Sequence, residues 1–235
     1  MEEGQMKSCK KDEKKYLLAL KAKPNDATTH NDYGTLLERT GREEEAGKQY
    51  LLALEADPNH AAAHYNYGNI LCKMGCKEET EKHYVFALKT EPNSAIIHNS
   101  YGVLLDNMGR KEEAEEHYLL ALEANPNNAA TYSNYGVLLK EMGRYNEAEK
   151  KYLLALKSDP NNSIAHYNYG NLLEKMGRYN EAEKQYLLAL EADPINVDAH
   201  YNYGILLEEM GREEEAEKHY NFALVNDPET QRHTY

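Results

Sequence analysis

The sequence predicts an all-α fold, a solenoid of antiparallel helix pairs. The first observation is a fixed period, because glycines and prolines each recur at a step of 34 residues through a chain of 235 residues. The periodic glycines are Gly34, Gly68, Gly102, Gly136, Gly170 and Gly204. The periodic prolines are Pro24, Pro58, Pro92, Pro126, Pro160, Pro194 and Pro228. The second observation is that apolar residues within each period follow the three- and four-residue spacing of amphipathic helices. Together they indicate one helical unit that has been copied and stacked.

The first elements expected are a leader and a half unit. Residues 1–10 are polar and charged, and we expect them to be a disordered leader. Residues 11–26 contain Tyr16, followed by Leu-Leu-Ala-Leu, and then Pro24, as the second half of every unit does. We therefore expect 11–26 to be an N-terminal half repeat, a capping helix that covers one open face of the stack.

Six full repeats follow without an insertion. They span 27–60, 61–94, 95–128, 129–162, 163–196 and 197–230, and residues 231–235 remain as a tail. In the fifth repeat, Leu172 and Leu173 belong to the apolar face of the first half, and Tyr186 and Ala189 to that of the second. Each half is therefore expected to be an amphipathic helix of roughly 13 residues.

Glycine and proline mark the ends of these helices. Gly177 lies between the two halves, where the C-terminus of a helix favours a left-handed residue. Asp193 precedes Pro194, and a residue before proline is pushed out of the helical region. Each repeat is therefore predicted to be a helical hairpin.

This pattern resembles that of the tetratricopeptide repeat family. Besides the 34-residue step, the residues that carry the resemblance are Gly170, Ala182, Tyr186, Ala189 and Pro194 and their counterparts in the other copies. Thr80 is the one exception, at the alanine place of the second repeat. The resemblance implies a right-handed superhelix whose first helices line a concave groove, and a function in binding other proteins.

Two places depart systematically from the family pattern. Place seven of each repeat is Tyr and place eleven is Leu, the reverse of the usual order, which we interpret as repacking of the same fold. Place four is usually Trp in the family, but here it reads His30, His64, His98, Tyr132, His166 and His200. We expect core or boundary histidines with hydrogen-bonded ring nitrogens, because neighbouring repeats are too far apart for them to share a metal ion.

The expected binding site lies on the first helices. Repeats 129–162 and 163–196 differ at 12 positions, and eight of these fall in the first helix, so the predicted inner wall is the surface that varies. The candidate peptide-binding residues, from the fifth, sixth and ninth places, are Tyr65, Asn66, Asn69, Asn99, Asn134, Tyr167, Asn168, Asn171, Tyr201 and Asn202. The sixth-place row resembles the asparagine ladder of O-linked N-acetylglucosamine transferases, and a carboxamide offers a peptide main chain both a donor and an acceptor. The alternative is that these asparagines bridge neighbouring first helices and that the tyrosines pack against the adjacent repeat.

Charge restricts the class of partner. The net charge of −13, from 40 acidic and 27 basic residues, disfavours nucleic acid and anionic membranes. Places two, five and six lack the basic residues of the family's carboxylate clamp, so we expect a neutral or mildly basic protein or peptide. Cys9, Cys72 and Cys76 form no paired framework or zinc pattern, and no secretory or membrane-spanning segment is evident. A cytoplasmic protein without metal or cofactor is expected.

The predicted function is a non-enzymatic protein-interaction module that binds an extended or helical peptide segment in its groove. The chain contains no nucleophile elbow, phosphate loop or dinucleotide fingerprint. One alternative is a scaffold that forms homo-oligomers through an uncapped C-terminal end, where Tyr220, Phe222, Ala223 and Leu224 lie on the last helix. The other alternative is a regulatory or substrate-docking subunit of an enzyme complex.

Overall fold

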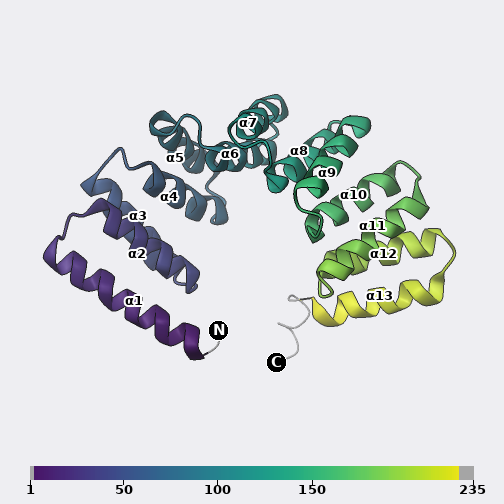
Figure 1. Ribbon diagram of the computed structural model, residues 1–235, viewed down its shortest axis with the longest axis horizontal. Coiled ribbons are helices and arrows are strands. Elements are labelled where there is room, and N and C mark those ends of the chain that lie inside the picture. Colours follow the sequence, from purple (N-terminus) through teal and green to yellow (C-terminus); the bar gives the residue numbers. More distant parts are fainter. Residues whose placement is uncertain (1–2, 228–235) are drawn as a thin grey trace. The chain divides into compact units, whose positions relative to one another are not determined.

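The protein is built from α-helices joined by short turns in the computed structural model, which describes residues 3–227, with side chains from Cys9 onward (Figure 1). Thirteen helices and no strand are present within these residues. The chain divides into two compact units, Met1–Ala124 and Asn125–Tyr235, and each is described by itself.

The first unit contains seven helices. They are α1 (Glu3–Ala22), α2 (Ala27–Arg39), α3 (Glu43–Ala56), α4 (Ala61–Lys73), α5 (Lys77–Thr90), α6 (Ala95–Asn107) and α7 (Lys111–Ala124). The most extensive contacts join the two helices of each repeat, α2 with α3, α4 with α5 and α6 with α7. Each pair then packs on the next, through α3 with α4 and α5 with α6. This is the expected stack of antiparallel pairs.

The second unit contains six helices arranged in the same way. They are α8 (Ala129–Glu141), α9 (Tyr145–Ser158), α10 (Ser163–Lys175), α11 (Tyr179–Ala192), α12 (Val197–Glu209) and α13 (Glu213–Asn226). Pairs α8 with α9, α10 with α11 and α12 with α13 stack through α9 with α10 and α11 with α12. The expected all-α fold of paired helices is confirmed.

The helix ends follow the local chemistry of the sequence. Gly177 has a φ of +73°, as expected, and its N–H and that of Arg178 donate to the carbonyls of Glu174 and Leu173 at 2.8 and 2.9 Å. At the start of α10 the side chain of Asn162 accepts the N–H of Ala165 at 2.9 Å. Side-chain capping and a left-handed glycine therefore set the hairpin geometry.

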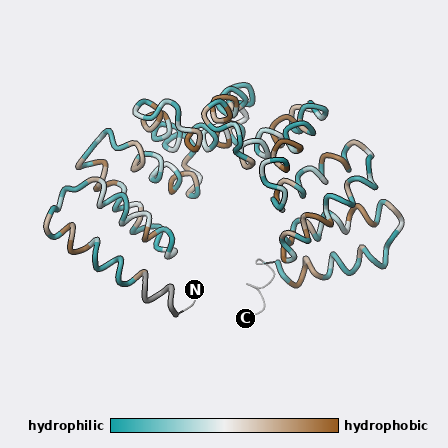
Figure 2. The backbone as a smooth tube through the Cα atoms, viewed as in Figure 1, coloured by the Kyte–Doolittle hydropathy of each residue, from teal (hydrophilic) through white to brown (hydrophobic). Residues whose placement is uncertain are grey.

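Small residues let the two helices of a repeat approach closely. A Cβ added at Gly170 would lie 2.9 Å from ring atoms of Tyr186, closer than real contacts allow. Tyr186, Ala182 and Ala189 are fully buried. Hydrophobic residues recur along the helices with hydrophilic ones between them (Figure 2), so each pair has one buried side.

One expectation about the termini is corrected. Helix α1 begins at Glu3, so the expected disordered leader, residues 1–10, is helical from residue 3. The segment is rich in Glu, Gln, Met and Lys, which favour helix, and Cys9 packs against the buried cluster around Leu36 and Leu37. The expected tail, 231–235, lies outside the described residues.

Candidate functional site

The first helices of the repeats form one layer within each unit. Helix α2 contacts α4, and α10 contacts both α8 and α12. The ten candidate residues lie on α4, α6, α8, α10 and α12 of these layers. The layer is therefore where a groove lined by the fifth, sixth and ninth places of the repeat would run.

In the second unit, three candidate residues form one hydrogen-bonded network. The amide nitrogen of Asn202 donates to the hydroxyl of Tyr167 at 2.9 Å and to Oδ1 of Asn171 at 3.0 Å. The Asn171 oxygen also accepts the hydroxyl of Tyr186 at 2.6 Å, and that hydroxyl lies 2.7 Å from Glu174. Burial raises the pKa values of both Tyr167 and Glu174. The network thus ties α12 to α10 and α10 to α11.

In the first unit, the corresponding contacts are separate. The amide nitrogen of Asn66 donates to Oδ1 of Asn31 at 2.9 Å, joining α4 to α2. The hydroxyls of Tyr65 and Ser100 lie 3.1 Å apart, joining α4 to α6. Asn69 accepts the hydroxyl of Tyr84 at 2.6 Å within its own repeat.

These contacts bear on the two interpretations of the sixth-place asparagines. Asn66 and Asn202 bridge neighbouring first helices, as in the alternative interpretation. The amide nitrogen of Asn202 donates both of its hydrogens to these partners. Its side-chain oxygen accepts no hydrogen bond from a described residue, so Asn202 can still act as an acceptor. Asn168 is half-buried and makes no hydrogen bond with any described residue, so it can still donate and accept. Asn99 and Asn134 are also half-buried.

An aromatic hollow lies at the end of the second unit, between α12 and α13. Its volume is about 470 Å³, and Tyr201, Tyr220 and Leu224 are among the residues that line it. Tyr201 is 53% exposed, and its ring centroid lies 5.7 Å from that of Tyr220. Asp198 of α12 also lines the hollow. The same helix carries Glu208 and Glu209 and has no Lys or Arg. This end of the first-helix layer is therefore aromatic and acidic.

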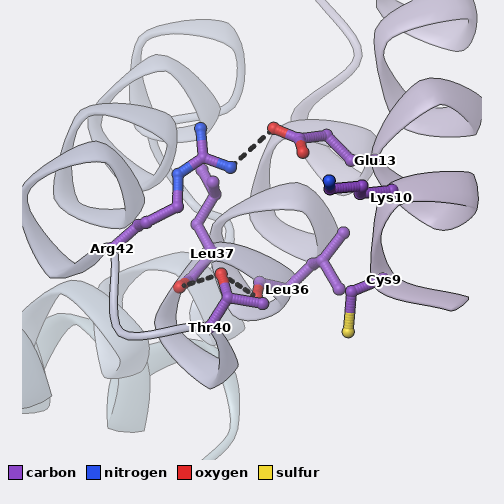
Figure 3. Close-up of a pocket in the computed structure, with 7 residues that line it drawn as sticks. All are labelled: Cys9, Lys10, Glu13, Leu36, Leu37, Thr40 and Arg42. Carbon is purple, nitrogen blue, oxygen red and sulfur yellow. Dashed lines mark hydrogen bonds and ion pairs between the residues drawn. The ribbon is translucent and has the colours of Figure 1, made fainter. Parts of the chain in front are cut away.

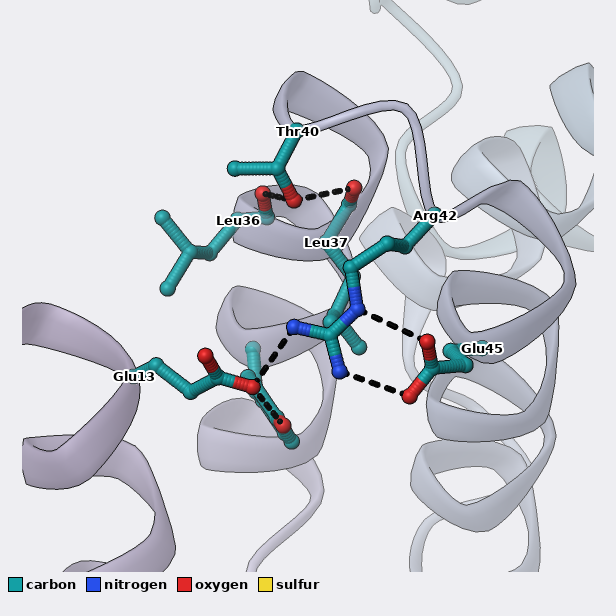
Figure 4. A network of polar contacts seen from close by, with 7 residues as sticks. Glu13, Leu36, Leu37, Thr40, Arg42 and Glu45 are labelled. Atoms are coloured by element: carbon teal, nitrogen blue, oxygen red, sulfur yellow. Dashed lines mark hydrogen bonds and ion pairs between the residues drawn. The ribbon is translucent and has the colours of Figure 1, made fainter. Parts of the chain in front are cut away.

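The sequence did not predict a second recurrent feature, which we call the polar clasp. In the first of these clasps Arg42, at the start of α3, lies between two carboxylates (Figure 4). It donates to Glu13 of α1 at 2.7 Å and, through two nitrogens, to Glu45 at 2.7 Å. Tyr33 of α2 donates to the same Glu13 at 2.8 Å. The hydrogen bonds from Arg42 and Tyr33 lower the pKa of Glu13.

The polar clasp recurs at other junctions between repeats. It is formed by Glu81, Tyr101, Arg110 and Glu113, by Glu149, Tyr169, Arg178 and Glu181, and by Glu183, Tyr203, Arg212 and Glu215. The shared glutamate comes from the second helix of the preceding repeat. Charged residues on an outer helix are usually solvated, but Glu149 and Glu183 keep only 20% of their side-chain surface exposed. The sequence did contain a signal of this pairing. The first repeat has Gly47 in place of the shared glutamate, and the second repeat, which follows it, has Cys76 in place of the arginine.

A small hollow lies next to the first clasp, between α1 and α2. It has a volume of about 150 Å³, and Cys9 and Lys10 line it together with Leu36 and Thr40 (Figure 3). Arg42 and Glu13, which form an ion pair, also line it. The hollow is thus part of the packing between α1 and α2.

The fourth-place histidines are hydrogen-bonded at both ring nitrogens, as expected. Nε2 of His64 lies 3.0 Å from the carbonyl of Pro58, and Nδ1 lies 2.9 Å from Nδ1 of His83. His98 with His117 and His200 with His219 repeat this pairing. The partners of His30 and His166 are glutamines, Gln49 and Gln185. Burial is the main cause that lowers the pKa of His83 and of His117 to about 4. These partners lie on the second helices, 19 residues after the histidines, and were not predicted from the sequence.

Among the described residues, no group of three or more His, Cys, Asp or Glu side chains is placed to hold a metal ion. None of the helices in residues 3–227 has the length and apolar content required to cross a bilayer.

Solved structures similar to this chain share its fold. One is the Cut9–Hcn1 hetero-tetramer of the APC/C, with a TM-score of 0.82 and 15% identity, covering 92% of this chain and 44% of that chain. The present chain thus spans less than half the length of that one. PilF of Pseudomonas aeruginosa gives a TM-score of 0.74 and 22% identity, covering 88% and 96% of the two chains. YrrB, described as a TPR protein with an unusual peptide-binding site, gives a TM-score of 0.60 and 23% identity, covering 78% and 95%.

Sequence comparisons identify the family. A search of curated protein sequences found no match. Three family models, each described as tetratricopeptide repeat, match most of the chain between residues 14 and 229. The first matches 50–82, 117–150 and 151–184, the second 14–61 and 170–229, and the third 95–128. These repeats support a protein–protein interaction module, and the chain belongs to the tetratricopeptide repeat family.

Proposed function

We propose that the chain binds an extended or helical segment of a partner protein along its layer of first helices, without catalysing a reaction. The observation that carries this proposal is the polar and aromatic surface of α10 and α12. Tyr201 is exposed there, Asn168 keeps its full hydrogen-bonding capacity, and Asn202 keeps an acceptor. An acceptor on the wall suits a peptide N–H, and each such hydrogen bond contributes about 1 kcal/mol net.

The charge of α12 gives the expected class of segment. Asp198, Glu208 and Glu209 lie on this helix, which has no Lys or Arg. A segment with Lys or Arg would be attracted to this end of the layer, while a strongly acidic one would be repelled. This sharpens the expected neutral or mildly basic peptide toward a basic one. A cytoplasmic setting remains part of the proposal, since all three cysteines are free thiols.

The test is a peptide selection followed by affinity measurements. Random 12-residue peptides would be selected on the full chain, and the selected peptides measured by fluorescence anisotropy against Asn168→Ala and Tyr201→Ala. We expect affinity to fall about tenfold in each variant, with basic residues enriched among the selected peptides. Asn180→Ala is the matched control, because Asn180 is exposed on α11. Selected peptides that bind the Asn168 and Tyr201 variants as tightly as the original chain would refute the proposal.

A second candidate function is self-assembly through the C-terminal end. The hollow of about 470 Å³ between α12 and α13 supports it, because aromatic and aliphatic side chains line it. If this end mediates association, Leu224→Lys should abolish a concentration-dependent rise in mass measured by sedimentation. A mass that stays monomeric in the original chain at all concentrations would exclude this function.

A further inference from the structure

The outer helices carry an apolar pair that the core does not use. At two adjacent places of α1 and of the second helices α3, α5, α7, α9 and α11, large hydrophobic side chains are 37–58% exposed. In the first unit these residues are Leu17, Leu18, Leu51, Leu52, Val85, Phe86, Leu119 and Leu120. The buried stripe of α3 is already complete without them, since Ala46, Tyr50 and Ala53 are fully buried. Water-exposed apolar residues that recur in register are typical of a contact surface.

A lysine accompanies the pair on the same face of the helix. Lys14, Lys48 and Lys82 precede the first apolar residue of α1, α3 and α5 by three positions, which places both on one side of the helix. All three lysines are exposed, and none has a carboxylate within 4.0 Å among the described residues. These lysines therefore form a positively charged row on a chain whose net charge is −13.

We propose that the outer face of α1, α3 and α5 is a second docking surface, which binds an amphipathic helix of a partner protein. The apolar side of that helix covers the pairs at Leu51 and Val85, and acidic residues along its edge face Lys48 and Lys82. This docking surface is independent of the layer of first helices, so either proposal can fail alone.

Charge complementarity distinguishes this occupant from a second copy of the chain. Suppose that two copies met with their outer helices antiparallel and their apolar pairs facing each other. Each lysine of one helix would then lie opposite the residue seven positions after the corresponding lysine of the other helix. These residues are Lys21 on α1, Glu55 on α3 and Lys89 on α5. Two of the three are lysines, so self-pairing in register is mostly repulsive.

A flat anionic membrane also fits less well than a helix. Glu44 and Glu78 lie one turn before Lys48 and Lys82 on the exposed face, within the acidic first turns of α3 and α5. A bilayer surface would meet these carboxylates together with the lysines. A helix about 10 Å wide can cover the apolar pair and the lysine and leave the glutamates in water.

The probe is a fluorescein-labelled 18-residue helix with leucines on one side and glutamates along both edges, measured by anisotropy with the full chain. A second peptide has lysines in place of the glutamates. We expect the acidic peptide to bind at least about tenfold more tightly than the basic one. Lys48→Glu with Lys82→Glu should reverse that preference, and Leu51→Gln with Val85→Gln should remove binding. Asn221, at the same place on α13, shows that the position accepts a polar residue.

Each contrary result has a defined meaning. Equal binding of the two peptides, or binding unchanged in Leu51→Gln with Val85→Gln, would refute the proposal. Self-association, or sedimentation with phosphatidylserine vesicles, that disappears in this variant would assign the surface to a second copy or to a membrane instead. Asn168→Ala should leave the acidic peptide bound, which separates this surface from the first-helix layer. Unchanged melting temperatures would show that the variants remain folded.

Discussion

Two junctions within the first unit are built differently. Between α5 and α6, Glu81 accepts from Tyr101 and Arg110 at 2.6 Å each, which forms a polar clasp. Between α3 and α4, Gly47 and Cys76 stand where the shared glutamate and the arginine would be. The junction loses both partners together, so no unpaired charge is left in it. The joint replacement is what a coupled pair predicts, because either charged residue alone would be left without its partner.

The junction between α3 and α4 has another link, which is more exposed. Lys73 of α4 lies 2.8 Å from Glu38 and 2.9 Å from Glu43, and about half of the Lys73 and Glu43 side chains is exposed. Exposed pairs contribute roughly 0–1 kcal/mol, less than hydrogen bonds to a partly buried charge. In addition, Gly47 lies inside α3, where glycine costs roughly 0.5–1 kcal/mol relative to alanine. On these polar contacts and on the glycine, we expect the junction between α3 and α4 to open more readily than the one between α5 and α6.

The largest effect is expected from breaking the clasp between α5 and α6. Glu81→Ala would leave the hydroxyl of Tyr101 and one side of the Arg110 guanidinium without their acceptor. The expected loss is about 2 kcal/mol, because hydrogen bonds to a charged group are lost at a partly buried site. Hydrogen–deuterium exchange of α5 and α6 would measure it as faster local opening.

Glu79→Ala is the matched control for this prediction. Glu79 lies on the same helix, at the place where other repeats pair a glutamate with the clasp arginine, but Cys76 replaces that arginine. It should change exchange little. If both variants accelerated exchange equally, the clasp would have no special role.

The second prediction is that the clasp can be restored between α3 and α4. A Cβ at Gly47 would lie 3.8 Å from Tyr67 and Ile70, which is ordinary contact. Cys76 precedes α5 with a backbone like that of Arg178 before α11. Gly47→Glu with Cys76→Arg should therefore stabilise the junction by about 1–2 kcal/mol, seen as slower exchange in α3 and α4.

The single variants isolate the paired contribution. Gly47→Ala should gain only the helix-propensity difference of roughly 0.5–1 kcal/mol. Cys76→Arg alone should gain little, because its acceptor is missing. Strict additivity of Gly47→Glu and Cys76→Arg in a double-mutant cycle would contradict the idea of a coupled clasp.

The third prediction concerns acid pH and contrasts repeats with different histidine partners. The pKa of His83 and of His117 is about 4 in the folded chain, mainly through burial, against about 6.5 in an unfolded chain. The unfolded state therefore binds more protons as the pH falls from 6.5 toward 4, and stability is lost over that window. Melting temperatures should be constant above about pH 7 and fall below 6.5.

His83→Gln is the matched variant, because Gln49 and Gln185 already partner the fourth-place histidines of two other repeats. It should flatten part of the pH dependence while leaving stability at pH 7 nearly unchanged. The groups that face His83 are His64 and the edge of the Tyr67 ring, with Lys82 beside it. An identical pH dependence in the variant would show that His83 does not cause the loss.

The period predicted most of the fold because its residues act locally. Gly177 ends a helix through its own backbone, and Gly170 touches Tyr186 within the same hairpin, so spacing alone indicated their roles. Helix α1 was underestimated because its first residues lack the apolar period that was used to find helices. The contacts of the candidate site were harder to predict from the sequence, since the bridging role of Asn202 depends on the distance between α10 and α12.

The polar clasp escaped the sequence analysis for a related reason. Its glutamate and arginine are 29 residues apart and belong to different repeats, so comparison of copies one by one does not bring them together. Only the joint replacement at Gly47 and Cys76 reveals the pair in the sequence. Charged residues on an outer helix are usually solvated, and only packing shows that these lie between helices.

The smallest effect is expected from removing one hydroxyl of the clasp. Tyr101→Phe deletes the 2.6 Å hydrogen bond to Glu81 and should cost about 1 kcal/mol, since Arg110 still pairs with the carboxylate. Tyr67 occupies the same place at the junction without a clasp, and its hydroxyl has no hydrogen-bond partner among the described residues. Tyr67→Phe should therefore be neutral within measurement error in urea unfolding. Equal losses for the two variants would mean that ring packing, and not the hydroxyl, distinguishes the junctions.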